Sequence, residues 1–178
     1  SKNEQQKSVS NQVQTARIMA NGDLLYHDGL YMSALQADGS YDFTENFTYV
    51  KPWLKQADLV LGDFEGTINP DYPLSGYPLF NAPQSVTAAI KDAGYDVMDL
   101  AHNHILDSGL EGAFTTADAF KKVGIDPVGV YEKPVRNKAP LLIKNVNGIK
   151  VAILSYAYGY NGLESNLTDK EVVCNLFI

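Results

Sequence analysis

The sequence predicts an α/β fold, with a mixed β-sheet or sandwich flanked by helices. Short apolar runs of strand length alternate with segments whose apolar residues recur at helical spacing. Asn147-Gly148, between two late apolar runs, predicts a β-hairpin. Strands joined through helices pair in parallel and a hairpin is antiparallel, so the expected sheet is mixed.

The predicted strands are short apolar runs bounded by Gly, Pro or polar residues. In chain order they cover residues 17–21, 57–61, 95–101, 125–131, 140–146 and 149–156. Each of the first three runs leads directly into polar side chains. Such runs predict buried strands whose ends lie at one edge of a sheet.

Helical spacing of apolar residues predicts helices within segments 28–35, 41–56, 83–93 and 109–123. Thr44 is the expected N-cap of the second segment, and Pro52 predicts a break inside it. Gly94 and Gly124 follow the last two helices as stop signals. Residues 66–82, rich in Pro and aromatic side chains, predict a long ordered loop that forms either a wall of the site or ordinary surface packing.

The two ends of the chain differ from its middle. Residues 1–14 are polar and are expected to form a flexible leader, whereas residues 15–170 form the predicted domain. Residues 171–178 are an apolar, atypical tail, and we expect a truncated domain. No apolar run approaches the length of a membrane span, and a signal peptide or anchor could precede Ser1.

Composition excludes several classes of function. The chain has 178 residues and is 45% hydrophobic, which suits one globular domain with a substantial core. Lys and Arg number 14 against 21 Asp and Glu, so the net charge is -7. Nucleic acids and anionic lipids need cationic contacts, so we expect neither as a partner. The single cysteine, Cys174, excludes a disulfide framework and a Cys-rich zinc site.

Polar side chains at the strand ends form the main candidate site. If these strands are parallel neighbours, Asp23, Asp63, Glu65, Asn103 and His104 converge on one rim. These are hard or borderline ligands without a thiolate, a set that suits Mn, Fe, Zn or Mg. Two such ions can hold both oxygens of an in-line phosphoryl displacement and acidify a bound water. Taken alone, each residue also has an ordinary structural explanation, such as a turn aspartate.

Histidines supply the candidate proton donor. Two of the three histidines in the chain, His102 and His104, lie two residues apart, and either could protonate a leaving group. Asp107 could orient a histidine or cap the next helix. His27 is expected to be a surface loop residue, with a place on the same rim as the alternative. A serine hydrolase is the weaker enzyme hypothesis because no Gly-x-Ser-x-Gly elbow is present.

Three motifs together resemble the bacterial CapA family, capsule-synthesis proteins associated with poly-γ-glutamate. They are Gly22-Asp23, Gly62-Asp63-Phe64-Glu65 and His102-Asn103-His104, with Phe80-Asn81-Ala82-Pro83 between the last two. The resemblance is collinear over residues 16–165. It implies a fold like that of the calcineurin-like metallophosphoesterases, a mixed β-sandwich flanked by helices with divalent metal ions at the strand ends.

The resemblance also implies roles for individual residues. Asp23 matches the ligand of the first motif, and Asp63 and Glu65 match a Gly-Asn-x-Glu stretch in which Asp here replaces the usual Asn. Asn103 and His104 match an Asn-His pair, as a metal ligand and as a catalytic or ligand histidine. His102 stands where Asn is more usual.

The family continues with later histidine motifs that this sequence lacks. We therefore expect the chain alone to be catalytically weak or inactive unless a second chain completes the rim. The implied setting is the extracellular face of the bacterial membrane, with a missing N-terminal anchor and a phosphoester or polyglutamate-type surface polymer as substrate. The alternatives are a non-catalytic binding or scaffold module of a polymer-export complex, and a homodimer formed by exposed sheet edges.

Overall fold

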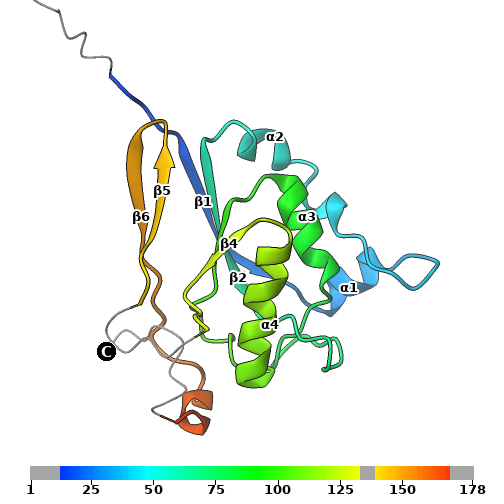
Figure 1. Cartoon of the computed structure of the whole chain (residues 1–178). Helices are drawn as coiled ribbons and strands as arrows, with labels where there is room; N and C mark the ends of the chain where they lie inside the picture. The colour runs from blue at the N-terminus through cyan, green and yellow to red at the C-terminus, as the bar shows by residue number, and fades with distance from the viewer. Residues whose placement is uncertain (1–12, 133–138, 169–178) are drawn as a thin grey trace, which may run out of the picture.

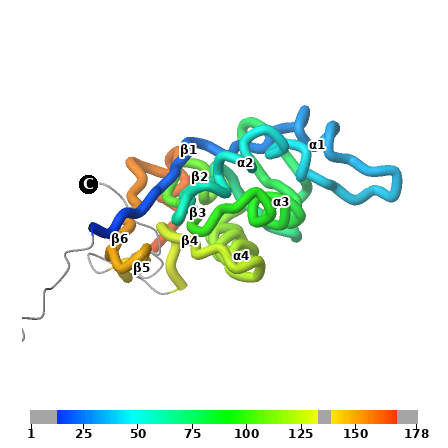
Figure 2. The backbone as a smooth tube through the Cα atoms, turned by 90° about the horizontal axis from the view of Figure 1, so that it is seen from above, coloured from blue at the N-terminus to red at the C-terminus, as the bar shows by residue number. Residues whose placement is uncertain are grey.

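The computed structural model describes residues 13–132 and 139–168. Four parallel strands form one sheet in the order β1-β2-β3-β4, and a hairpin forms a separate antiparallel sheet, β5-β6. Figures 1 and 2 show the hairpin on one face of the parallel sheet and helices on the other. The predicted α/β fold flanked by helices is confirmed. The strands are β1 (Ile18–Leu25), β2 (Leu59–Glu65), β3 (Val97–Asp99), β4 (Asp126–Val128), β5 (Leu142–Val146) and β6 (Ile149–Ile153).

The helical segments largely follow the predicted spacing. Segment 41–56 is divided as expected, with Pro52 in the first turn of its second helix. The N-cap prediction for Thr44 is wrong, because Phe43 precedes the helix and the Asp42 carboxylate accepts hydrogen bonds from the Thr44 backbone and hydroxyl. The helices are α1 (Asp28–Ala34), η1 (Thr44–Phe47), α2 (Lys51–Leu54), α3 (Ser85–Ala93), α4 (Gly109–Lys122) and η2 (Leu163–Asn166).

The late hairpin turns where the sequence predicts it. Asn147 and Gly148 have φ angles of 51° and 85°, the left-handed conformations that a type I′ turn needs. The hairpin forms a separate sheet that packs on the parallel sheet, which is the sandwich form of the predicted fold and not a single mixed sheet. The predicted strands at 125–131 and 149–156 are shorter than expected, because β4 ends at Val128 and β6 at Ile153.

Side chains of β2 alternate between two apolar layers. Val60 and Phe64 belong to the larger core, which lies under the helices, whereas Leu59 and Leu61 pack with Val146 and Ile153 of the hairpin. Successive strand residues point to opposite faces. Asp63 and Glu65 therefore share the hairpin-facing side with Leu59 and Leu61, and this side changes from apolar to acidic along one strand.

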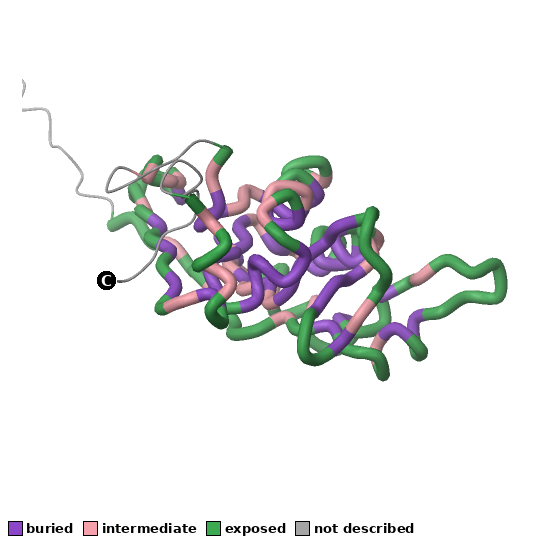
Figure 3. Tube along the Cα trace, turned by 90° about the horizontal axis from the view of Figure 1, so that it is seen from below, coloured by how far each residue is buried: buried purple, intermediate pink, exposed green. Residues whose placement is uncertain are grey.

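Burial follows these layers. Figure 3 shows buried residues gathered in the middle of the molecule, and residues 35–40 are all exposed. Among the described residues, no helix has the length and hydropathy required to cross a lipid bilayer. Most of the predicted leader, the tail at 171–178 and Cys174 lie outside the described residues.

Replacing Phe64 with alanine should lower the free energy of unfolding by about 3–5 kcal/mol, because the change opens a cavity in the core. Phe64 is 0% exposed, and its ring centroid lies 5.1 Å from that of Phe120. Urea unfolding measures the change. Tyr49→Ala is the control, since Tyr49 is 88% exposed and its loss should cost no more than about 0.5 kcal/mol. Equal effects of the two substitutions would contradict this packing.

Candidate functional site

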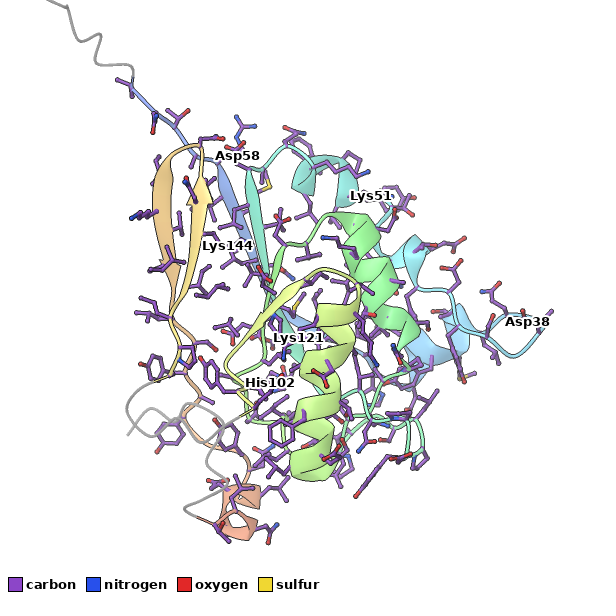
Figure 4. All side chains as sticks on the ribbon, viewed as in Figure 1. Asp38, Lys51, Asp58, His102, Lys121 and Lys144 are labelled. Carbon is purple, nitrogen blue, oxygen red and sulfur yellow. The ribbon has the colours of Figure 1, made fainter. Side chains whose placement is uncertain are left out.

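Three aspartates from adjacent parallel strands occupy one level of the sheet. Asp23 of β1 is paired with Asp63 of β2, and Asp63 is paired with Asp99 of β3. Paired residues of parallel strands project from the same face, so the three carboxylates are neighbours. They lie toward the carboxyl ends of the strands, the end marked by His102 in Figure 4 and opposite to Asp58.

The hairpin ends just before this row of Asp23, Asp63 and Asp99, the acidic row. Beyond the end of β6, the hydroxyl of Ser155 donates a hydrogen bond to Oδ1 of Asp99, and the Ala101 backbone N–H donates to the same oxygen at 2.9 Å. Gly129 makes this close approach possible. A Cβ at Gly129 would lie 2.5 Å from the Ser155 hydroxyl and 2.7 Å from the Ala101 nitrogen, and the φ of Gly129 is 98°. The hairpin layer is thus joined to the acidic row through Asp99.

The acidic row is short of positive charge. Burial, followed by the charges of Asp99, Asp23 and Glu65, raises the pKa of Asp63 to about 7. Burial and a hydrogen bond with Asp23 raise the pKa of Glu65. Burial also raises the pKa of Asp99, against the opposing hydrogen bonds from Ser155 and the backbone. Neighbouring carboxylates disfavour one another's ionisation, and a bound cation would compensate their charge in place of protons.

His104 is held beside the row by groups on both of its ring nitrogens. Its Nδ1 lies 2.7 Å from Oδ2 of Asp107, whose side chain is only 1% exposed, and its Nε2 lies 3.6 Å from Oε1 of Glu65. The Phe80 backbone N–H donates to the same Asp107 oxygen at 2.6 Å. Of the two roles expected for Asp107, the structure shows contact with a histidine. Ser108 precedes α4 and makes no side-chain cap.

The loop at 66–82 forms a wall against this histidine. The Phe80 ring meets His104 edge to face with centroids 4.8 Å apart. The loop is held by Asn81, whose side-chain amide donates to the carbonyls of Asn69, Tyr72 and Pro73. These contacts favour a role at the site over ordinary surface packing.

His102 and Asn103 have other partners. His102 is buried, its Nδ1 accepts a hydrogen bond from the His104 N–H at 3.1 Å, and its Nε2 lies 3.3 Å from the Gly66 nitrogen. Burial, then the charge of His104, lowers the pKa of His102 to about 3, so its ring is neutral. Asn103 is exposed and donates its amide to Oδ1 of Asn161 at 3.2 Å.

His27 lies at the beginning of α1. Its Nδ1 accepts a hydrogen bond from the backbone N–H of Asp28 at 2.7 Å, which caps the helix. Its Nε2 lies 3.3 Å from the Tyr77 backbone nitrogen in the loop at 66–82. His27 therefore connects α1 to the wall of the site.

Asp99 and its partner Ser155 were not among the predicted site residues. A signal for Asp99 was present, because an acidic residue interrupts the apolar run at 97–101 just before the strand end. Ser155 carried no comparable signal. Its approach to Asp99 depends on how the hairpin stacks on the sheet, across 56 residues of sequence.

The donors present suit a hard divalent cation. Oδ1 of Asp63 and Oδ1 of Asp107 are buried without a hydrogen-bond partner, and unpaired buried oxygens favour a ligand that would satisfy them. The oxygen and imidazole donors of Asp23, Asp63, Glu65 and His104 match the preferences of such ions. Within residues 13–132 and 139–168, however, no three or more His, Cys, Asp or Glu side chains already stand as a metal-binding group. The donors approach one another in pairs.

Asp63→Asn should change the pH dependence of stability in the metal-free protein. An acid whose pKa is raised by folding stabilises the folded state while it is protonated. This contribution is present below the unfolded pKa of about 4 and is lost as the pH rises through about 7. In EDTA, we expect the variant to match the wild type near pH 4 and to exceed it in stability at about pH 8.

Urea unfolding across this pH range measures the effect. The control is Asp38→Asn, because hydrogen bonds from Ser40 lower the pKa of the exposed Asp38 carboxyl, and its loss gives no gain at high pH. A constant difference between wild type and Asp63→Asn at every pH would contradict the raised pKa.

Sequence comparison places this site in a known family. The family described as bacterial capsule synthesis protein PGA_cap matches residues 17–174. Capsule biosynthesis protein CapA of Bacillus anthracis is 36% identical over 117 residues, which cover 62% of this chain and 28% of that protein. PGA biosynthesis protein CapA of Bacillus subtilis (strain 168) is 28% identical over 113 residues, or 62% of this chain and 30% of that protein.

A third relative, the uncharacterized protein y4sH of Sinorhizobium fredii (strain NBRC 101917 / NGR234), is 27% identical over 161 residues, which cover 86% of this chain and 32% of that protein. The chain thus spans roughly a third or less of the length of each relative. The family match covers nearly the whole chain, from β1 through the hairpin and η2. The chain belongs to the bacterial capsule synthesis protein family PGA_cap, the CapA family that its strand-end motifs resemble.

Proposed function

We propose that the chain is the metallophosphoesterase-like part of a capsule-biosynthesis protein and acts on a phosphoester during synthesis of a surface polymer. The observation that carries the proposal is the row of register-aligned carboxylates beside His104, with buried oxygens that lack partners. The family match and the names of the CapA relatives support the role in capsule biosynthesis.

In this proposal Asp23, Asp63, Glu65 and His104 hold one or two divalent cations, drawn from Mn, Fe, Zn or Mg. A bound cation supplies Lewis acidity toward a phosphoryl oxygen and lowers the pKa of a bound water. Asp63 supplies a buried oxygen that has no other partner. Asn103 would be a further ligand only through its side-chain oxygen, because its amide nitrogen donates to Asn161.

His104 is the residue that we propose binds metal or transfers a proton. Asp107 fixes the ring at Nδ1, so Nε2 faces Glu65 and is the atom that binds metal or moves a proton to the leaving group. Phe80 covers one edge of the ring and keeps water from that side. We assign His102 a positioning role, because it accepts the His104 backbone N–H and its own ring is buried and neutral.

The proposed setting is the extracellular face of the bacterial membrane, where a capsule is assembled, with attachment through a segment outside this chain. The substrate is a phosphoester or a surface polymer of the polyglutamate type. The described residues supply donors from only three strand ends, and we propose that a further protein segment or a second copy of the chain completes the rim.

A non-catalytic binding or scaffold module is the second candidate. The observation that favours it is that the donors in the described part of the chain do not form a ready metal-binding group. Metal content separates the two candidates, because a scaffold has no need of stoichiometric metal.

Titration of the metal-free protein with Mn²⁺ by isothermal calorimetry should show stoichiometric binding. Asp63→Asn should weaken that binding by about tenfold or more, since it removes a buried donor. Asp38→Asn is the matched control, because Asp38 lies on an exposed extension far from His102 (Figure 4). No binding by the wild type, or equal binding by both variants, would exclude the metal site and favour the scaffold.

Hydrolysis of bis(p-nitrophenyl) phosphate with added Mn²⁺ tests whether this chain is sufficient. We expect turnover near the background of the metal alone, since the donors come from three strand ends. If turnover is detectable, His104→Ala should lower it by about 100-fold, the size of a lost proton donor. Robust turnover that Asp63→Ala abolishes would show that no second chain is needed.

A further inference from the structure

A pocket of about 570 Å³ adjoins the turn that carries the candidate site residues. It is lined by two segments, the turn that follows β3 and the stretch that leads from β6 into η2. The first segment contributes His102 and Asn103, and the second contributes Tyr156, Tyr158, Asn161 and Glu164, among others. Its volume is in the range of small-molecule binding sites.

The pocket and the acidic row meet at a shared turn. His102 and Asn103 line the pocket, and His104, the next residue, faces Glu65. The hydrogen bond from Asn103 to Asn161 joins the two lining segments. A phosphoryl group beside His104 would therefore have its organic substituent within reach of this pocket.

The lining combines aromatic rings, amides and a single acid. Tyr156 and Tyr158 are 54% and 94% exposed, so ring surface remains for a ligand to cover. Asn103 and Asn161 carry amide groups that both donate and accept hydrogen bonds. Glu164 is the charged lining residue, and one of its oxygens accepts a bond from the Tyr160 N–H at 3.1 Å.

The lining also excludes one class of ligand. Among the residues that the structure describes, no Lys or Arg lines the pocket, and the chain as a whole carries a net charge of -7. Within this described lining an anionic substituent would find no cationic partner and would meet the Glu164 carboxylate. Burial of an unpaired charge is costly, so the pocket disfavours carboxylate-rich chains such as glutamyl oligomers.

We propose that this pocket binds a neutral, hydroxyl-bearing group, a sugar ring, whose apolar face packs on the tyrosines and whose hydroxyls bond to the amides and to Glu164. Aromatic faces pack well against flat C–H surfaces, and tyrosine adds a polar end for hydroxyls. Combined with the proposed phosphoester chemistry, on which this step rests, the substrate class becomes a sugar phosphoester. Saccharide binding itself does not depend on that chemistry.

The test measures binding to the metal-free full chain in EDTA, by calorimetry or NMR titration. The neutral probes are glucose, N-acetylglucosamine and maltose, and the anionic probe is a γ-linked glutamate trimer. At least one neutral sugar should bind with an affinity in the millimolar range, and the trimer should not bind. Tyr158→Ala should weaken sugar binding by about three- to tenfold, the value of one aromatic contact.

Two further variants make the result specific. Tyr49→Ala, an equally exposed tyrosine between η1 and α2, should leave sugar binding unchanged. Tyr158→Lys should lose sugar binding and gain measurable affinity for the glutamate trimer, because it places a cation at the pocket. Tyr158 is 94% exposed, so neither substitution should disturb the folded core.

The proposal is overturned if none of the sugars binds, if the trimer binds the wild type as tightly as a sugar, or if Tyr158→Ala behaves like Tyr49→Ala. The experiment contains no metal, so its outcome is independent of the Mn²⁺ titration. Sugar binding without metal binding would leave the pocket standing and remove the phosphoesterase. Metal binding without sugar binding would exclude the saccharide pocket and leave the phosphoesterase proposal intact.

Discussion

Repulsion among three carboxylates at one level of a parallel sheet is the constraint on which this end of the molecule depends. Asp23, Asp63 and Asp99 are aligned by strand register, and Asp63 and Asp99 are partly removed from water, so the three cannot all be ionised without compensation. The raised pKa of Asp63, to about 7, is the sign of that conflict. Protonation of Asp63 relieves it, and a divalent cation would relieve it more completely.

The groups around the row are arranged to keep it in place. His104 is fixed between Glu65 and Asp107, and the Phe80 backbone holds Asp107 in turn. On the other side, Ser155 binds Asp99 from the end of the hairpin. The row is therefore clamped by a loop, by the turn after β3 and by the second sheet, and such a clamp limits how far the donors can separate when unoccupied.

The same alternation of side chains builds both the core and the site. Along β2, one face supplies Val60 and Phe64 to the layer under the helices, and the other supplies Leu59 and Leu61 to the hairpin before it supplies Asp63 and Glu65. The hairpin ends at the point where apolar residues give way to acids. A polar, tyrosine-lined pocket follows directly, so the acidic row and this pocket share one turn of the chain.

Much of this arrangement is visible in the sequence. Strand-length apolar runs ending in Asp or His predicted parallel strands with their polar ends at one edge, and Asn147-Gly148 predicted the hairpin turn. These features are local, since a strand pattern, a helical period and a turn dipeptide each depend on neighbouring residues. The grouping of Asp23, Asp63, Glu65 and His104 followed from strand order, which the alternation of strands and helices already favours.

What the sequence alone determined is therefore the set of elements, the family and the chemical kind of the strand-end residues. The tertiary structure decided that the hairpin stacks as a second layer, that Ser155 reaches Asp99 and that Phe80 and Asp107 hold His104. It also decided that Asn103 turns to Asn161. Each of these depends on the packing of segments far apart in the chain, or on a choice among hydrogen-bond partners that no local pattern encodes.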